Sequence, residues 1–432
     1  MKISDVLFIK DMIALKIRKI ISAAAAMLLL SGCSSVAESV NSFIENDANI
    51  GKNAPAVNGT IGDIEALNEE AAKTGTEYES EEEKAAKAAK KRREELNKKA
   101  DEIISQMTAE EKMGQLILAR MPSSPASEMT EYQYGGYTLY GVDFKKSDPE
   151  GITALTAEIA EAAKISPFFA VDEEGGTVVR VSAYTQYRDE PFSSPQLLFS
   201  RGGKELLELD TEEKAKLLTS MGINLNLAPV ADISADRSSY IYPRTMGQGA
   251  EGTAEGVAAI VKTAAENNLA SCIKHFPGYG ENTDTHKDAA HDSRELYEFY
   301  NRDFVPFEAG INADENKTPA VMVGHTIYDM IDPDIPASLS PVIHEALRDK
   351  LEFDGVVITD DLGMDALKNY SSEQSIYVQA ILADNDMLCV SDPETAYADL
   401  LEAYNSGVIT DDILNAHVKR IIIMKLQYKI IK

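Results

Sequence analysis

Tryptophan is absent from the 432-residue sequence, and only three residues are cysteine. The missing tryptophan disfavours a long polysaccharide-binding groove, because indole rings commonly form the platforms of such grooves. Cys272 and Cys389 lie in apolar stretches typical of a protein core, so we expect no structural disulfide. A Gly-rich phosphate-binding loop is also missing from the sequence, and no cofactor is expected.

Basic residues are in the minority: 42 Lys and Arg stand against 71 Asp and Glu, which gives a formal net charge of −29 at pH 7. This excess of negative charge repels phosphate groups, so it argues against nucleic acid as a partner. Apolar residues make up 44% of the chain, enough to bury a core. The length suits one barrel of about 250 residues with an extension, or two to three average domains.

Residues 1–32 are basic at first, then apolar, and end in small residues directly before Cys33. This order is typical of a secretion signal. Its end resembles a bacterial lipoprotein signal, in which the cysteine receives a diacylglycerol after cleavage. We therefore expect a lipid anchor at Cys33 on the extracytoplasmic face of the cell membrane, with Met1 or Met12 as the start. A plain N-terminal anchor is the alternative, which the short apolar run disfavours.

Three further parts follow the predicted signal. Residues 33–76 are small and polar, and we expect a disordered tether because they offer little apolar surface. Within residues 77–107 an acidic block precedes a basic one, which predicts a solvated charged helix and not a binding surface. Thr108 and Glu111 form a capping-box pattern before helical apolar positions, so residues 108–432 are expected to form one folded domain.

Short apolar runs recur in this domain, most of them separated by helix-compatible stretches. Strand–helix alternation predicts a parallel sheet with both faces covered. Several runs end in polar or ionisable residues, and a TIM-type (β/α)8 barrel gathers its chemistry at such strand ends. A doubly wound sheet has the same local pattern but usually adds a phosphate loop, so we favour the barrel. The seven predicted strands are residues 116–119, 168–171, 225–230, 271–273, 321–323, 356–358 and 387–390.

The first segment with catalytic potential reads KHFPGYG at residues 274–280 and is followed by Asp284 and His286. These two residues are two positions apart, so in an extended loop they project to the same side. The carboxylate can then hold the imidazole and raise its pKa, as a proton-transfer pair near neutral pH requires. The alternative is that both residues merely decorate a solvent-exposed loop.

The second segment, GVVITDDLGM at residues 355–364, delivers Asp360 and Asp361 at the end of a β-branched run. Adjacent strand residues face opposite ways, so only one of the two carboxylates can point into a barrel mouth. The alternative is a pair of helix-capping acids. In the third segment, VDEEGGTVVR at residues 171–180, acids and Arg180 converge on paired glycines, a composition suited to sugar hydroxyls. Metal binding is the rival interpretation, but no His/Cys spacing supports it.

Further segments complete a resemblance: EEKMGQ at 110–115, APVAD at 228–232, RTMG at 244–247, VMVGH at 321–325 and PASLS at 336–340. Over residues 95–425 the sequence resembles glycoside hydrolase family 3, specifically its single-domain β-N-acetylhexosaminidase branch. The resemblance implies a (β/α)8 barrel at residues 108–432 that hydrolyses terminal β-linked N-acetylglucosamine with retention of configuration. It implies no metal and no cofactor.

By this resemblance, Asp360 matches the nucleophile, His286 the acid/base and Asp284 its partner. The implied sugar-binding set is Asp172, Arg180, Arg244, Lys274, His275, Met246 and His325. Relatives that act on glucosides draw a carboxylate acid/base from an additional C-terminal domain, whereas this chain ends soon after its last predicted strand, so His286 is expected to serve. The expected partners are an amino-sugar oligosaccharide or muropeptide and the membrane, and the expected state is a monomer.

Three departures from the family pattern concern the sugar site and one strand. Tyr279 stands where the branch more often has His, Thr245-Met246 where Ser-Phe is common, and residues 383–386 read ADND where a glycine is usual before the last Asp. These differences put subsite preference in doubt more than reaction type. The alternatives are a β-glucosidase, xylosidase or arabinosidase of the same family, a phosphorylase, or a non-catalytic sugar-binding lipoprotein.

Overall fold

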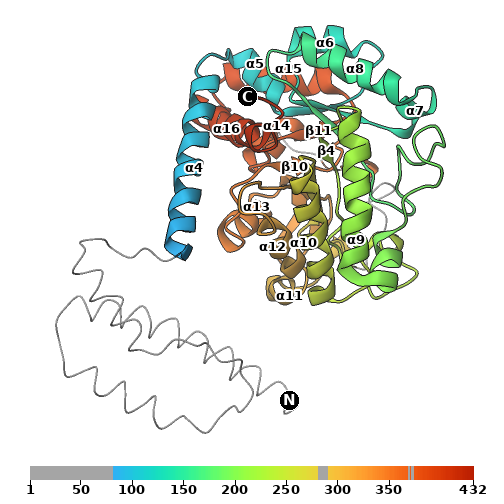
Figure 1. Cartoon of the computed structure of the whole chain (residues 1–432). Helices are drawn as coiled ribbons and strands as arrows, with labels where there is room; N and C mark the ends of the chain where they lie inside the picture. The colour runs from blue at the N-terminus through green and yellow to red at the C-terminus, as the bar shows by residue number, and fades with distance from the viewer. Residues whose placement is uncertain (1–80, 281–289, 368–369, 371–373) are drawn as a thin grey trace, which may run out of the picture. The chain divides into compact units, whose positions relative to one another are not determined.

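The computed structural model describes residues 81–432 except 281–289, 368–369 and 371–373 (Figure 1). Contacts divide the chain into Met1–Ser80 and Glu81–Lys432, and the second unit is described below. Its helices are α4 (Glu81–Ile104), α5 (Ala109–Gln115), α6 (Pro125–Tyr132), α7 (Gly141–Lys145), α8 (Pro149–Ala162), α9 (Pro195–Ser220), α10 (Ala250–Glu266), α11 (Leu296–Asn301), α12 (Phe304–Ile311), α13 (Pro341–Glu345), α14 (Ile376–Leu382), α15 (Pro393–Asn405) and α16 (Asp411–Gln427). None of these helices is long and apolar enough to cross a membrane.

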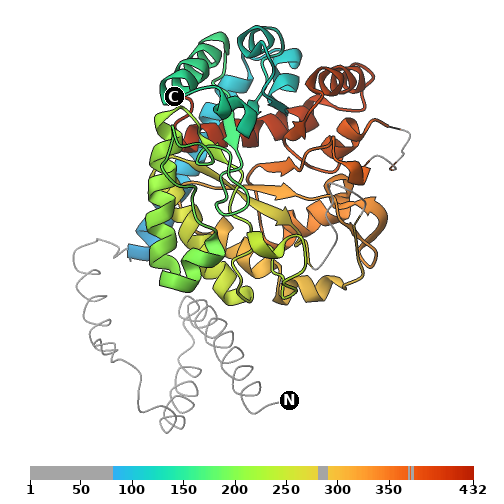
Figure 2. The ribbon, with the colours of Figure 1, turned by 90° about the vertical axis from the view of Figure 1, so that its right-hand side faces the viewer.

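Eight parallel strands form the centre of this unit, and in Figure 2 their arrows lie inside a ring of helices. The strands are β1 (Ile117–Arg120), β2 (Gly136–Leu139), β3 (Phe168–Val171), β4 (Leu225–Asn226), β5 (Ala270–Phe276), β7 (Ala320–Val323), β10 (Val357–Thr359) and β11 (Leu388–Val390). The hydrogen-bonded order runs β10-β7-β5-β4-β3-β2-β1-β11. A bridge between Ile358 and Met387 links the two ends, which makes a nearly closed barrel and confirms the predicted fold.

Strand β2 was not among the seven predicted strands. It begins with Gly136 and contains Thr138, so it lacks the apolar run that marks the other strands. The glycine is required by close packing, because a Cβ at Gly136 would lie 2.6 Å from the Phe168 carbonyl oxygen of β3. Packing between strands therefore selects residues here that hydrophobicity alone does not reveal.

Alternate residues of the strands face the barrel interior and the surrounding helices. Cys272 and Ile358 belong to the large core cluster, whereas their neighbours Ile273 and Val357 belong to a second cluster that contains Phe304 of α12. The first pair therefore points inward and the second pair outward. This alternation determines which side chains reach the mouth of the barrel.

The N-terminal elements of the unit agree only in part with the sequence-based prediction. Thr108 and Glu111 form the predicted capping box at the start of α5. Helix α4 lies within the predicted range 77–107, but it is not solvated all round: Ala100 is fully buried and Ile104 is 7% exposed. Its inner face packs on α16, because apolar residues recur there at helical spacing among the charged ones. The predicted signal and tether lie outside the described residues.

Candidate active site

The mouth of the barrel is lined by the residues that follow the inward-facing positions of each strand. Lys274 stands two residues after Cys272, and Asp360 two residues after Ile358, so both side chains point into the mouth. Lys274 lies 2.6 Å from Asp172 at the end of β3. Three strands thus bring together residues that are widely separated in the sequence.

Asp360 and Asp361 have different surroundings, as strand alternation predicts. Asp361 accepts hydrogen bonds from Gly363 N at 2.9 Å and from Ser391 Oγ at 2.8 Å, so its side chain fixes the loop after β10. Asp360 is the inward carboxylate, and Asp361 N donates to its Oδ1 at 2.9 Å. His325 donates from Nε2 to the Asp361 carbonyl at 3.0 Å, next to the same strand end.

The carboxyl of Asp360 is held in its ionised form. Burial by itself would raise the pKa of Asp360, but the charges of His325, His275 and Lys274 at acidic pH outweigh burial and lower it below its ordinary value. An ionised, largely buried carboxylate close to cationic side chains has the properties of a nucleophile or of an electrostatic stabiliser of a cation.

Glu174 joins two of the predicted sugar-binding cations. Arg244 donates from Nε to Glu174 Oε2 at 3.0 Å and from Nη2 to Oε1 at 2.8 Å, and Lys274 Nζ lies 2.7 Å from the same Oε1. Burial alone would raise the pKa of Glu174, but both cations together lower it far below its usual range. Glu174 is 4% exposed, so it acts on the site through Arg244 and Lys274.

His275 lies between the carboxylate of Asp232 and the guanidinium of Arg244. Its Nδ1 lies 2.7 Å from Asp232 Oδ2, and its Nε2 lies 3.3 Å from Arg244 Nη2. Together with the contacts of Glu174, this gives an unbroken series of hydrogen bonds across three strand ends, called here the polar chain. Its members are Asp232, His275, Arg244, Glu174, Lys274 and Asp172.

Comparison with known proteins identifies the family of the chain. Residues 108–424 match the glycosyl hydrolase family 3 N-terminal domain. The chain belongs to glycoside hydrolase family 3. It is 36% identical over 266 residues to a β-hexosaminidase of Stenotrophomonas maltophilia (strain K279a), covering 60% of this chain and 76% of that relative. A β-hexosaminidase of Hydrogenovibrio crunogenus is 33% identical over 259 residues, covering 57% of this chain and 70% of the relative.

Two solved structures share the same architecture. A β-N-acetylglucosaminidase from Paenibacillus sp. str. FPU-7 superposes with a TM-score of 0.69 at 26% identity, over 75% of this chain and 63% of that structure. The match therefore spans less than two thirds of the Paenibacillus chain. A β-N-acetylhexosaminidase from Beutenbergia cavernae superposes with a TM-score of 0.63 at 26% identity, over 73% of this chain and 98% of that structure.

The remaining residues expected from the family 3 resemblance differ in their placement. Arg180 follows the turn after β3, and Glu173 holds it by accepting from Arg180 N at 2.8 Å and from Val181 N at 2.7 Å. Met246 is fully buried in a small cluster with Leu198 and Leu207 of α9. Asp284, His286 and Cys33 lie outside the described residues.

Four residues of the family 3 mouth were not assigned a role from the sequence. Glu174 and Asp232 belong to the segments at 171–180 and 228–232, but their ion pairs require partners from other strands. Arg120 ends β1, and its guanidinium carbon lies 4.7 Å from the centre of the Tyr140 ring, which follows β2. Burial raises the pKa of Tyr140, and the charges of Asp361 and Asp172 raise it further. The only sequence signal for a place in the mouth was the position of each residue after the end of a strand.

A second cluster of acids lies at the opposite end of the barrel, where Asp386 stands two residues before the start of β11. Asp384, Asp386 and His417 are close enough to hold a cation. Their carboxylates are already bound by two arginines: Arg348 Nη2 lies 3.0 Å and Arg420 Nε 2.7 Å from Asp386. Because these cations already balance the charge of the carboxylates, the cluster has the character of a structural ion-pair network.

Proposed function

We propose that the protein is a retaining exo-glycosidase that removes terminal β-linked N-acetylglucosamine from amino-sugar oligosaccharides such as muropeptides. The observation that carries the proposal is Asp360, with its lowered pKa, at the same end of the barrel as the hydrogen-bonded pair Lys274 and Asp172. The names of the relatives, β-hexosaminidase and β-N-acetylglucosaminidase, support the choice of an amino sugar.

Asp360 would attack the anomeric carbon and form a glycosyl-enzyme intermediate, while His286 protonates the leaving oxygen. Water activated by the same histidine would then release the sugar with its configuration retained. Asp172, Lys274, Arg244 and His275 would bind sugar hydroxyls, because they converge at the mouth with donors and acceptors already oriented.

Asp360→Asn tests the nucleophile. The amide keeps the shape of the side chain but cannot form the glycosyl-enzyme ester in the same way, so we expect kcat on p-nitrophenyl N-acetylglucosaminide to fall by at least about 1000-fold. Asp361→Asn is the matched control, since Asp361 binds its own loop, and it should retain most activity. Unchanged turnover by Asp360→Asn would mean that another group is the nucleophile.

His286→Ala tests the acid role. Substrates with a good leaving group need little protonation, so we expect them to lose less activity than a natural disaccharide such as chitobiose. The measurement compares kcat/KM for both substrates in the variant and the wild type. Equal losses on the two substrates would count against an acid role for His286.

The choice of sugar is tested with a panel of nitrophenyl glycosides, with and without phosphate. We expect turnover of the N-acetylglucosaminide without phosphate dependence. Turnover of the glucoside, xyloside or arabinoside alone would assign the chain to another specificity within the family. A requirement for phosphate would identify a phosphorylase, and sugar binding without any turnover would leave a non-catalytic lipoprotein.

We further propose that a lipid on Cys33 anchors the enzyme at the extracytoplasmic face of the cell membrane. The proposal rests on the basic, apolar and small residues that precede Cys33 in the sequence. Metabolic labelling with a radioactive fatty acid should mark the wild-type chain and spare Cys33→Ser. Labelling of the variant would contradict the assignment.

A further inference from the structure

Asp232 has no assigned role, although it is among the most completely bound acids of the barrel. It is 1% exposed. Its Oδ2 accepts from His275 N at 3.2 Å and lies 2.7 Å from His275 Nδ1, and its Oδ1 accepts from Tyr279 N at 2.7 Å. Because both oxygens are occupied inside the protein, Asp232 does not reach a ligand in the mouth directly.

The partners of His275 determine where its ring proton lies. An ionised carboxylate can only accept a hydrogen bond, so the Nδ1 that faces Asp232 carries the proton. A guanidinium can only donate, so the Nε2 that faces Arg244 presents its lone pair. Asp232 and Arg244 therefore select the same tautomer of His275 from opposite sides.

The same carboxylate also shapes the turn that carries the histidine. By accepting from His275 N and Tyr279 N, Asp232 spans both ends of this turn, and Gly278 N closes it on the His275 carbonyl at 2.9 Å. The Tyr279 ring then lies edge-on to the imidazole, with 5.8 Å between ring centres. The His275 ring is thus fixed in rotation as well as in protonation.

The position of the Arg244 guanidinium depends on the orientation of the His275 ring. Glu174 binds two nitrogens of the guanidinium, and Nη2 is shared with His275 Nε2. If the proton moved to Nε2, two donors would face each other at 3.3 Å in a site where His275 is 5% exposed. Arg244 would then have to shift away from the position in which Glu174 holds it.

We propose that Asp232 is a positioning residue for the sugar site. It fixes the tautomer of His275 so that Nε2 accepts hydrogen bonds, and this in turn holds Arg244 at the mouth. The proposal rests on the proposed function only in that a sugar is the ligand of His275 and Arg244. It extends that function by naming the residue on which their geometry depends.

Asp232→Asn tests the role by kinetics. The amide is close to isosteric but presents a donor to one of its present partners, so His275 loses its fixed orientation. We expect KM for p-nitrophenyl N-acetylglucosaminide to rise about tenfold, as for the loss of one buried polar contact, while kcat changes less than about threefold. Asp236→Asn, four residues later in the same segment, is the matched control and should leave both constants unchanged.

A double-mutant cycle separates positioning from general stability. If Asp232 acts through His275, then Asp232→Asn combined with His275→Ala should bind substrate no more weakly than His275→Ala alone. A purely structural role would instead add its own loss of binding together with a fall in melting temperature. Additive effects on KM would therefore overturn the proposal.

A measurement on the wild-type chain decides the matter even if Asp232→Asn fails to fold. Nitrogen NMR of the protein labelled in its six histidines, with His275→Ala to assign the signal, should show the Nδ1–H tautomer for His275 at neutral pH. An Nε2–H tautomer would contradict the role of Asp232. This result is independent of turnover, so failure of the proposed activity and failure of this inference are distinguishable.

Discussion

Glu174 shows how one buried charge can support two binding residues. It pairs with both Arg244 and Lys274, and Lys274 also pairs with Asp172, so two buried cations share two carboxylates. A buried pair stabilises little relative to an apolar core, but removing one member of it is costly. The carboxylate therefore balances the buried charge of the mouth, and its removal from the folded barrel is expected to be destabilising.

We expect Glu174→Gln to lower the free energy of unfolding by about 3 kcal/mol, because a neutral amide leaves the two cations undercompensated. Urea denaturation measures the change. Glu213→Gln is the matched control: its partner Arg188 lies 2.9 Å away, but the Glu213 side chain is 56% exposed, so the loss should stay below about 1 kcal/mol. Equal losses of unfolding free energy in the two variants would contradict the role of Glu174 as a buried counter-charge.

The sequence predicted individual site residues better than their connections. Alternation along one strand indicated that only one of Asp360 and Asp361 faces the mouth, and local rules suffice for this. The contacts of Glu174 with Arg244 join residues 70 positions apart, and they depend on the stagger of neighbouring strands. No local pattern reports that stagger, so the polar chain became visible only in the folded barrel. Met246 was placed by resemblance, whereas packing against Leu207 buries it.

At the scale of elements, helix α16 buries a lysine among apolar residues. Lys425 is fully buried; it donates from Nζ to Gln115 Oε1 at 2.7 Å and lies 5.2 Å from the Phe168 ring centre. Burial lowers the pKa of Lys425 to about 7. The folded protein therefore holds this amine largely uncharged under mildly basic conditions.

Lys425→Met should flatten the pH dependence of stability. The folded pKa lies below the unfolded value of about 10.4, so between pH 7 and 10 the unfolded chain binds more protons, and wild-type stability rises with pH. Relative to the variant, the wild type should gain up to about 1.4 kcal/mol per pH unit in this window. Urea unfolding at pH 7, 8 and 9 measures the slope. Lys419→Met, at a side chain that is 31% exposed on the same helix, should show no such slope.

Elements with a regular apolar pattern were predicted well, and elements defined by packing were not. The capping box at Thr108 is a local signal and is confirmed. Strand β2 was missed because close packing against the backbone of β3 requires glycine at position 136, and this packing leaves no hydrophobic pattern in the sequence. The inner face of α4 was missed because its few apolar residues are outnumbered by charges, although Leu96, Ala100 and Ile104 repeat at intervals of four.

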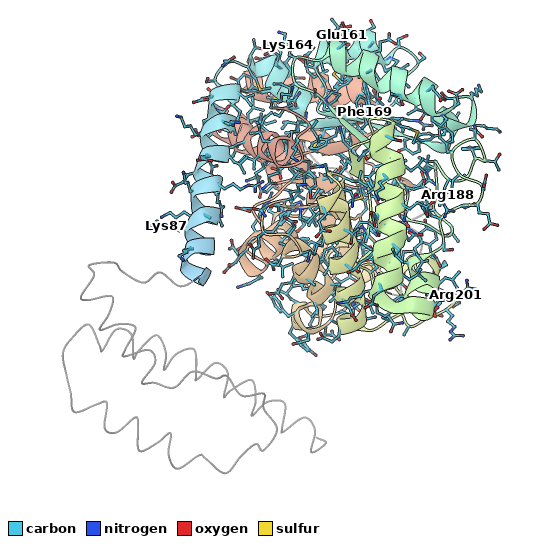
Figure 3. All side chains as sticks on the ribbon, in the orientation of Figure 1. Lys87, Glu161, Lys164, Phe169, Arg188 and Arg201 are labelled. Carbon is cyan, nitrogen blue, oxygen red and sulfur yellow. The ribbon has the colours of Figure 1, made fainter. Side chains whose placement is uncertain are left out.

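At the scale of the molecule, α4 extends the barrel core beyond the family match, which begins at residue 108. Ala100 and Ile104 belong to the main core cluster, and Asp101 lies 2.7 Å from Lys419 of α16. Figure 3 shows the side chains of α4 along the flank of the barrel, with Lys87 at its outer end. The helix is therefore part of the folded unit.

A chain that begins at Thr108 should therefore melt at a lower temperature than one that begins at Glu81. Removing α4 exposes apolar surface of α16 at a cost of roughly 25 cal/mol per Å². Differential scanning calorimetry of the two chains measures the difference. A charge-only variant, Asp101→Asn in the longer chain, should change the melting temperature by much less, since that ion pair is exposed. Equal melting temperatures of the two truncated chains would show that α4 adds nothing.

The polar chain is held together by its own contacts, and this has a consequence for recognition. Each of its members has a protein partner, so a ligand need not reorganise the mouth in order to bind. The affinity of a ligand then depends on the removal of water from this rigid arrangement. Any small molecule with a matching pattern of hydroxyl groups can gain a large part of that affinity. The geometry of the polar chain is accordingly a template for shaping inhibitors.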